Sequence, residues 1–185
     1  MKRMIVMLTC LLAVAIGQNL LTNGDFEQDL TVGWTASQYS GAYVAIDRDP
    51  TLQPDPDYEA RDSLYGYGWA KLAQMVDAPG VMLTLDFWAR FEIAGTSTTC
   101  WPVACVTVGY YDASNVWLGE TRFYYHNSYC TWAPTSTLSL IEVTNPDWAQ
   151  YELNVADELS QHLPGVDPGA VARLEVALYD TTAGG

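Results

Sequence analysis

The chain has 185 residues, of which 22 are acidic and 8 are basic, so its net charge is −14 at neutral pH. This balance excludes a typical nucleic-acid-binding protein, because such proteins take most of their affinity from Lys and Arg that neutralise phosphates. It suits a soluble protein with an uncharged ligand. The length fits one domain with a full hydrophobic core, and the 12 Tyr and 7 Trp favour a β-protein over a helical one.

The first 17 residues have the pattern of a secretory signal peptide. A short basic start at Lys2 and Arg3 precedes an apolar run over residues 5–16, and the small residues Ala15 and Gly17 stand at the two positions that a signal peptidase reads. We therefore expect cleavage near Gly17, a mature domain over residues 18–185, and a secreted or cell-surface location. The apolar run is shorter than the roughly 20 residues of a membrane-spanning helix, so no membrane span is expected.

Short alternating segments separated by Gly, Pro, Asp and Asn follow residue 18, and this pattern predicts an all-β, antiparallel fold, either a β-sandwich or a barrel. Residues 47–62 are rich in Pro and Asp, which predicts a long surface loop rather than a strand. Residues 156–162 predict a short helix that ends before Pro164 and Gly165. The expected strands, in chain order, cover residues 19–21, 34–37, 43–46, 70–75, 81–91, 103–111, 117–125, 148–155 and 172–179.

The alternation is strongest over residues 81–91, where apolar and polar side chains take turns. Successive side chains of a strand point to opposite faces, so one face of this strand is expected in the core and the other in solvent. The same division recurs in the strands near residues 104–111, 148–155 and 172–179. The sequence therefore predicts a sheet whose outer face carries polar and aromatic side chains.

Three cysteines remain after cleavage, so at least one lies outside any internal disulfide. An antiparallel hairpin of residues 103–111 and 117–125 would place Cys100 opposite Cys130 at its open end and Cys105 near Tyr124. We expect a Cys100–Cys130 disulfide, which would stabilise the fold by about 3–4 kcal/mol, with Cys105 outside the bridge. The alternative is three reduced cysteines that pack as small apolar groups.

Catalytic motifs are weak in this chain. His126 and His162 have no metal-ligand spacing to each other or to the cysteines, and no G-x-S-x-G motif is present. Pairs of carboxylates occur in any chain with 22 acids, so they do not identify a glycoside hydrolase. We expect a non-enzyme and keep a glycoside hydrolase, or a fragment of one, as an alternative.

The outer faces of the predicted strands, which carry polar and aromatic side chains, fit a sugar-binding surface better than a catalytic site. A sugar ring has an apolar C–H face that stacks on aromatic rings and a rim of hydroxyls that bind amides, carboxylates and Arg. Tyr and Trp are also ordinary core residues of a sandwich, and this interpretation stays open for each of them. The predicted ligand-binding residues are Trp88, Arg90, Tyr111, Arg122, Tyr124 and Gln150.

The opening stretch N-L-L-T-N-G-D-F-E, residues 19–27, followed by Gly33 and Trp34, resembles the start of carbohydrate-binding modules of the cellulose- and xylan-binding type. The resemblance continues through L-T-L-D-F-W-A-R, residues 83–90, and D-W-A-Q-Y-E-L-N-V, residues 147–155. These modules belong to the galactose-binding-like jelly-roll superfamily and accompany secreted glycoside hydrolases.

The resemblance implies a jelly-roll β-sandwich that binds a polysaccharide of the glucan or xylan type without cleaving it. It also implies a structural calcium ion, for which Asp25 and Glu27 are the matching positions. The family closes with a further strand, whereas this sequence reaches Gly185 where that strand would begin. We therefore expect a sandwich that lacks its last strand, with a catalytic or surface domain encoded downstream. A structural or adhesive cell-surface domain that binds proteins is the alternative function.

Overall fold

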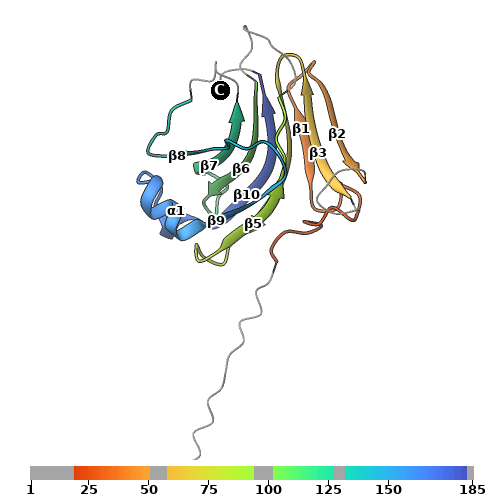
Figure 1. Ribbon diagram of the computed structural model, residues 1–185. Coiled ribbons are helices and arrows are strands. Elements are labelled where there is room, and N and C mark those ends of the chain that lie inside the picture. The colour runs from red at the N-terminus through yellow and green to blue at the C-terminus, as the bar shows by residue number, and fades with distance from the viewer. Residues whose placement is uncertain (1–18, 51–57, 94–101, 127–131, 183–185) are drawn as a thin grey trace, which may run out of the picture.

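The computed structural model describes residues 19–50, 58–93, 102–126 and 132–182, and these residues form two packed layers of strands (Figure 1). The larger layer is a six-stranded sheet with the order β1-β4-β10-β6-β7-β8. Neighbouring strands are antiparallel except for β7 and β8, which are parallel. The strands of this sheet are β1 Thr35–Gln38, β4 Trp69–Asp77, β10 Arg173–Thr181, β6 Val103–Tyr111, β7 Trp117–His126 and β8 Leu138–Glu142.

Two separate two-stranded sheets form the second layer and cover one face of the six-stranded sheet. One sheet pairs β2, Tyr43–Asp49, with β3, Glu59–Tyr65. The other pairs β5, Thr84–Ala89, with β9, Ala149–Asn154, which leads directly into helix α1, Val155–His162. A 3-10 turn, η1, spans Pro168–Ala170. The structure thus confirms an all-β sandwich. No helix in the described ranges is long and apolar enough to cross a membrane.

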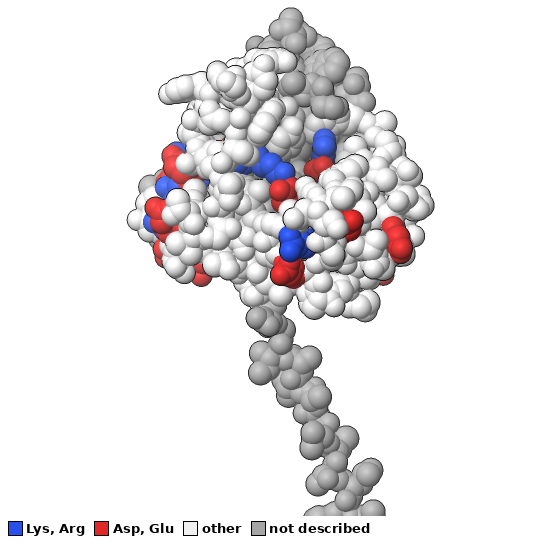
Figure 2. All heavy atoms as spheres, turned by 180° about the vertical axis from the view of Figure 1, so that it is seen from behind, with Lys and Arg blue, Asp and Glu red and all other residues white. Residues whose placement is uncertain are grey.

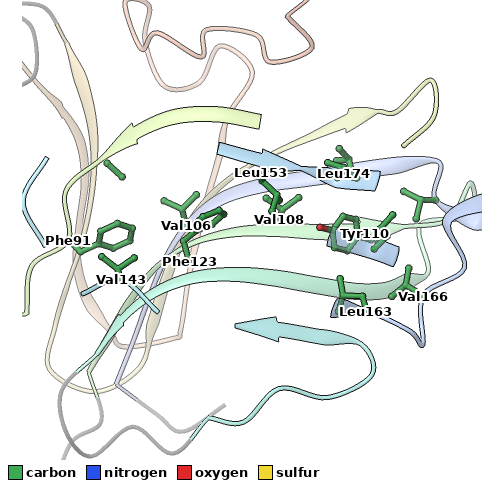
Figure 3. Close-up of a cluster of buried hydrophobic side chains, with 14 residues drawn as sticks. Phe91, Val106, Val108, Tyr110, Phe123, Val143, Leu153, Leu163, Val166 and Leu174 are labelled. Atoms are coloured by element: carbon green, nitrogen blue, oxygen red, sulfur yellow. The ribbon is translucent and has the colours of Figure 1, made fainter. Parts of the chain in front are cut away.

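The hydrophobic core lies between the two layers. It is formed by the apolar side chains that alternate with polar side chains along the strands. On β5, Leu85, Phe87 and Ala89 face inward, while Thr84 and Trp88 are exposed. The Phe87 ring packs against Phe123 of the facing sheet with 5.2 Å between ring centroids. Burying one such large apolar side chain contributes about 1.5–3 kcal/mol. Figure 3 shows the centre of this cluster, which includes Val106, Val108, Tyr110, Phe123, Leu153 and Leu174.

Two predicted segments differ from the structure. Residues 19–21 form no strand, because the opening segment folds into turns. The loop predicted over residues 47–62 is wrong at both ends, since β2 continues to Asp49 and β3 begins at Glu59. Arg61 of β3 binds Asp47 at 2.8 Å and Asp49 at 3.1 Å across the hairpin. These cross-strand ion pairs let charged residues occupy strand positions, which composition alone does not reveal.

Asn23 organises the opening segment from a left-handed backbone conformation with φ of 51°. Its side-chain amide nitrogen donates to the carbonyl oxygens of Gln28 at 3.1 Å and Asp29 at 3.2 Å. Its side-chain oxygen accepts from the Gln28 N–H at 2.8 Å, and its carbonyl accepts from the Trp34 indole at 3.0 Å. Asn23 is buried, so these bonds hold the segment in a single folded form.

A cavity of about 310 Å³ separates the two small sheets of the second layer. Glu59 of β3 and Leu85 of β5 lie on its two sides, and Val106, Val176 and Leu178 line it from the six-stranded sheet. Within the described residues, no strand pairing joins the two small sheets into one continuous sheet. A further strand in this layer stays a prediction.

Candidate functional site

The outer face of the six-stranded sheet, turned away from the core, carries most of the polar and aromatic side chains that the alternation predicted. We call it the polar face. In its central rows, Glu175 and Ala177 of β10 pair with Gly109 and Thr107 of β6, which pair with Glu120 and Arg122 of β7. Figure 2, seen from behind, shows basic and acidic side chains side by side across this side of the molecule. The polar face is defined by Lys71, Tyr111, Glu120, Arg122, Trp132, Glu175 and Tyr179.

Two mostly covered ion pairs lie at the centre of the polar face, and a third, between Arg173 and Asp77 at 2.9 Å, lies toward one end of it. The Lys71 ammonium binds the Glu175 carboxylate, which also accepts from the Tyr111 hydroxyl at 3.4 Å. Arg122 binds Glu120 through two contacts, Nε to Oε1 at 3.0 Å and Nη2 to Oε2 at 3.3 Å. The four charged side chains expose only 17–26% of their surface. Paired and mostly covered charges hold fixed positions, so this face presents a defined pattern of donors and acceptors.

Aromatic rings flank the Arg122 guanidinium on the same face. Its central carbon lies 4.4 Å from the centroid of the Trp132 ring and 5.9 Å from that of Tyr179, within the range of a cation–π contact. Trp132 also packs against Tyr124, with 5.9 Å between ring centroids. These rings cover Cys105, which is buried opposite Tyr124 as predicted.

Burial, followed by the charge of Glu175, raises the pKa of the Tyr111 hydroxyl to about 12. Burial also raises the pKa of Tyr179. Both hydroxyls therefore keep their protons at neutral pH and remain hydrogen-bond donors. The four charged side chains at the centre of the polar face, Lys71, Glu120, Arg122 and Glu175, neutralise each other in pairs, whereas the whole chain has a net charge of −14. Such a face suits a neutral ligand with many hydroxyl groups and apolar ring faces.

The six predicted ligand-binding residues do not form one site. Tyr111, Arg122 and Tyr124 belong to β6 and β7, on the outer side of the six-stranded sheet. The other three predicted residues lie on or next to β5 and β9 in the opposite layer, where they form a second outer face. These three residues are Trp88, Arg90 and Gln150.

The face of β5 and β9 is built differently. Trp88 pairs with Gln150 across the two strands and is 52% exposed. The Gln150 amide donates to both carboxylate oxygens of Asp86 at 2.9 Å. Arg90 binds Glu92 at 2.8 Å, and both side chains are largely exposed. The face of β5 and β9 therefore has one exposed indole ring, that of Trp88, and its Arg90–Glu92 ion pair is open to solvent.

Sequence reasoning missed four residues of the polar face: Lys71, Glu120, Glu175 and Tyr179. The strand near residues 172–179 did show an alternating pattern that placed Glu175 and Tyr179 on its non-core side. That signal does not reveal that β10 lies between β4 and β6, because this order depends on pairings between distant strands. The sequence indicated Trp132 only as an aromatic residue of a nearby loop, because it lies outside the strands and has no periodic signal.

The structure does not test the calcium site predicted at Asp25 and Glu27. Both side chains are exposed, and Glu27 Oε1 accepts from the backbone N–H of Tyr58 at 2.9 Å. No group of three or more His, Cys, Asp or Glu residues gathers as a metal site within the described ranges. The nearby carbonyls of Gln28 and Asp29 accept from the Asn23 amide. Calcium at these positions remains an untested prediction.

The predicted disulfide between Cys100 and Cys130 falls on residues outside the described ranges, so it also stays a prediction. The hairpin on which the pairing rests is confirmed. Val103 pairs with His126 and Cys105 with Tyr124, in the register that the sequence predicted.

No family model matches the chain, and the search of curated proteins found no match. The structure is similar to a solved structure described as "Structural basis for the promiscuous specificity of the carbohydrate-binding modules from the beta-sandwich super family". The two have 13% sequence identity and a TM-score of 0.50, and the match covers 92% of this chain. The chain spans 58% of the length of that structure. At this identity the likeness shows the shared β-sandwich fold.

Proposed function

We propose that this protein is a secreted, non-catalytic module that binds a neutral polysaccharide of the glucan or xylan type on the polar face. The observation that carries the proposal is the charge-balanced, mostly covered network of Lys71, Glu175, Arg122 and Glu120, held against aromatic rings on an outer sheet face. The similar solved structure concerns carbohydrate-binding modules of the same fold, which supports the choice of ligand.

Binding would combine stacking with hydrogen bonds. The Trp132 and Tyr179 rings are partly buried against Cys105 and Tyr124, and their uncovered sides would stack on the C–H face of a pyranose ring. Lys71 and Arg122 donate hydrogen bonds to sugar oxygens, and the Glu120 and Glu175 carboxylates and the Tyr111 hydroxyl oxygen accept from sugar hydroxyls. Because each charge already has a partner, an uncharged ligand meets little electrostatic penalty on this face.

The same network argues against a glycoside hydrolase. That chemistry needs one carboxyl group that keeps a proton at neutral pH and a second that is ionised. On the polar face, Glu120 and Glu175 are each bound to a cation. Both carboxylates are therefore placed to accept hydrogen bonds from the hydroxyls of a ligand.

We expect Arg122→Ala to weaken binding of the polysaccharide about 10- to 100-fold, because it removes a covered donor and the partner of Glu120. Arg90→Ala is the control, since Arg90 also pairs with a glutamate, Glu92, but in an exposed ion pair on the opposite layer. Affinity electrophoresis of both variants in gels containing the polysaccharide measures the effect. Equal mobility of the two variants would refute the assignment to the polar face, and loss of binding in Trp88→Ala alone would move the site to β5 and β9.

A further inference from the structure

Four exposed tyrosines gather at one end of the sandwich, on two neighbouring turns. Tyr39 is 44% exposed and Tyr43 is 74% exposed, and they bracket the turn from β1 to β2. Tyr65 is 55% exposed and Tyr67 is 65% exposed, and they belong to the turn from β3 to β4. We call these four residues the tyrosine platform. So much exposed aromatic surface in two turns is unusual unless the surface binds something.

The rings contact each other in pairs across the two turns. The Tyr39 and Tyr67 rings meet edge to face, with 5.8 Å between centroids and an interplanar angle of 89°. The Tyr43 and Tyr65 rings lie 5.4 Å apart at 53°, and the two residues are paired in the register of β2 and β3. Each ring therefore has a neighbour that limits its motion.

The turns beneath the rings are tied down by hydrogen bonds. The Tyr39 N–H donates to the Trp69 carbonyl at 2.9 Å, and the Gly68 N–H donates to the Thr182 hydroxyl at 3.0 Å. Gly68 has φ of 130°, and a Cβ at this position would lie 3.1 Å from Cβ of Tyr39. Only glycine suits this crowded, positive-φ position. The platform is thus preformed, which lowers the entropy cost of binding.

The chemistry of the platform indicates a neutral ligand. Residues 39–45 and 63–70 contain no charged side chain, although the chain as a whole has 22 acidic and 8 basic residues. The turns offer aromatic faces and phenol hydroxyls. A sugar ring matches both, since its C–H face stacks on an aromatic ring and its hydroxyls bind the phenol.

We propose that the tyrosine platform is a second contact site for pyranose rings of the polysaccharide. The inference rests on the proposed function for the class of ligand. The platform adjoins the polar face through β4, which begins at Trp69 beside Tyr39 and carries Lys71 two residues later. A long chain that occupies both surfaces gains affinity by multivalency, while a short oligosaccharide on one surface does not.

The test is the double variant Tyr43→Ala/Tyr67→Ala, which removes one ring from each pair. We expect at least a tenfold loss of affinity for the long polysaccharide in affinity electrophoresis, with unchanged affinity for an oligosaccharide of two or three units in calorimetry. Tyr43→Phe/Tyr67→Phe keeps the rings and should retain most of the affinity. Met82→Ala, at a side chain that is 85% exposed elsewhere, controls for loss of exposed apolar surface.

The outcomes separate this inference from the proposed function. Unchanged affinity in the double alanine variant, together with weakened binding in Arg122→Ala, would overturn the platform and leave the polar face standing. Normal binding in both variants would overturn both proposals. If the double alanine variant instead converted a wild-type dimer to a monomer in size-exclusion chromatography without a change in sugar affinity, the platform would be a protein contact and the inference would fail.

Discussion

Replacing Asp62 by Asn is expected to raise the free energy of unfolding at pH 8 by about 2–4 kcal/mol. Burial raises the pKa of the Asp62 carboxyl from 3.8 to about 7. At pH 8 the folded protein therefore holds an ionised carboxylate in a covered position, which costs free energy. An asparagine amide of nearly the same shape carries no charge and avoids this cost.

The structure shows why the charge is poorly accommodated. Both carboxylate oxygens of Asp62 are buried and lack a well-formed hydrogen bond from any described residue. The nearby Ser63 N–H lowers the pKa, but burial has the larger effect. Asp180 of β10 is a second covered acid, and burial, followed by the charge of Asp62, raises its pKa well above the usual range. The Leu64 N–H offsets part of that rise.

The pH dependence follows from these directions. Between about pH 4 and pH 7, the folded state keeps a proton on Asp62 that the unfolded state has released, so wild-type stability falls as the pH rises through this window. Urea denaturation at pH 5 and pH 8 measures the effect, and the gain in Asp62→Asn should be larger at pH 8. Asp147→Asn, at an exposed acid, is the control. Equal stability of Asp62→Asn and wild type at pH 8 would contradict this explanation.

Replacing Glu175 by Ala is expected to lower the free energy of unfolding by about 1–3 kcal/mol and to abolish polysaccharide binding. The substitution leaves the Lys71 ammonium, which is 26% exposed, without its carboxylate, and it removes the acceptor of the Tyr111 hydroxyl. The loss of stability is smaller than for a fully buried pair, because water still reaches the lysine.

A double variant separates the two effects. Lys71→Met/Glu175→Leu replaces both charges with apolar groups of similar size, so stability should return to near the wild-type value. Polysaccharide binding should remain absent, because the donor and the acceptor are both gone. Chemical denaturation and affinity electrophoresis on the same samples provide the two readouts. Recovery of binding along with stability would show that the pair only supports the fold and does not contact the ligand.

The local pattern of apolar and polar residues predicted the structural features that are formed by residues close together in the sequence. The hairpin of β6 and β7 was predicted together with its register, because both strands alternate clearly around a short turn. The inward and outward faces of β5 followed from its strict alternation, and helix α1 followed from its polar pattern before Pro164. These features depend on neighbours within a few tens of residues.

Features that depend on distant pairings could not be predicted. The polar face joins Lys71 of β4 to Glu175 of β10, which are 104 residues apart. Placing Trp88 and Tyr111 on opposite layers requires the strand order of both sheets, whereas alternation indicates only that each strand has two faces. The opening segment resembled the start of a strand, but Asn23 binds its own neighbours and folds the segment into turns.

The most direct test of the account is retention of the wild-type protein in native gels that contain one neutral polysaccharide each, with glucans and xylans in the panel and a plain gel as reference. If the protein binds a neutral polysaccharide, at least one polymer will retain it, and its mobility in the plain gel will be normal. A folded protein that migrates equally in every gel would contradict polysaccharide binding as its function.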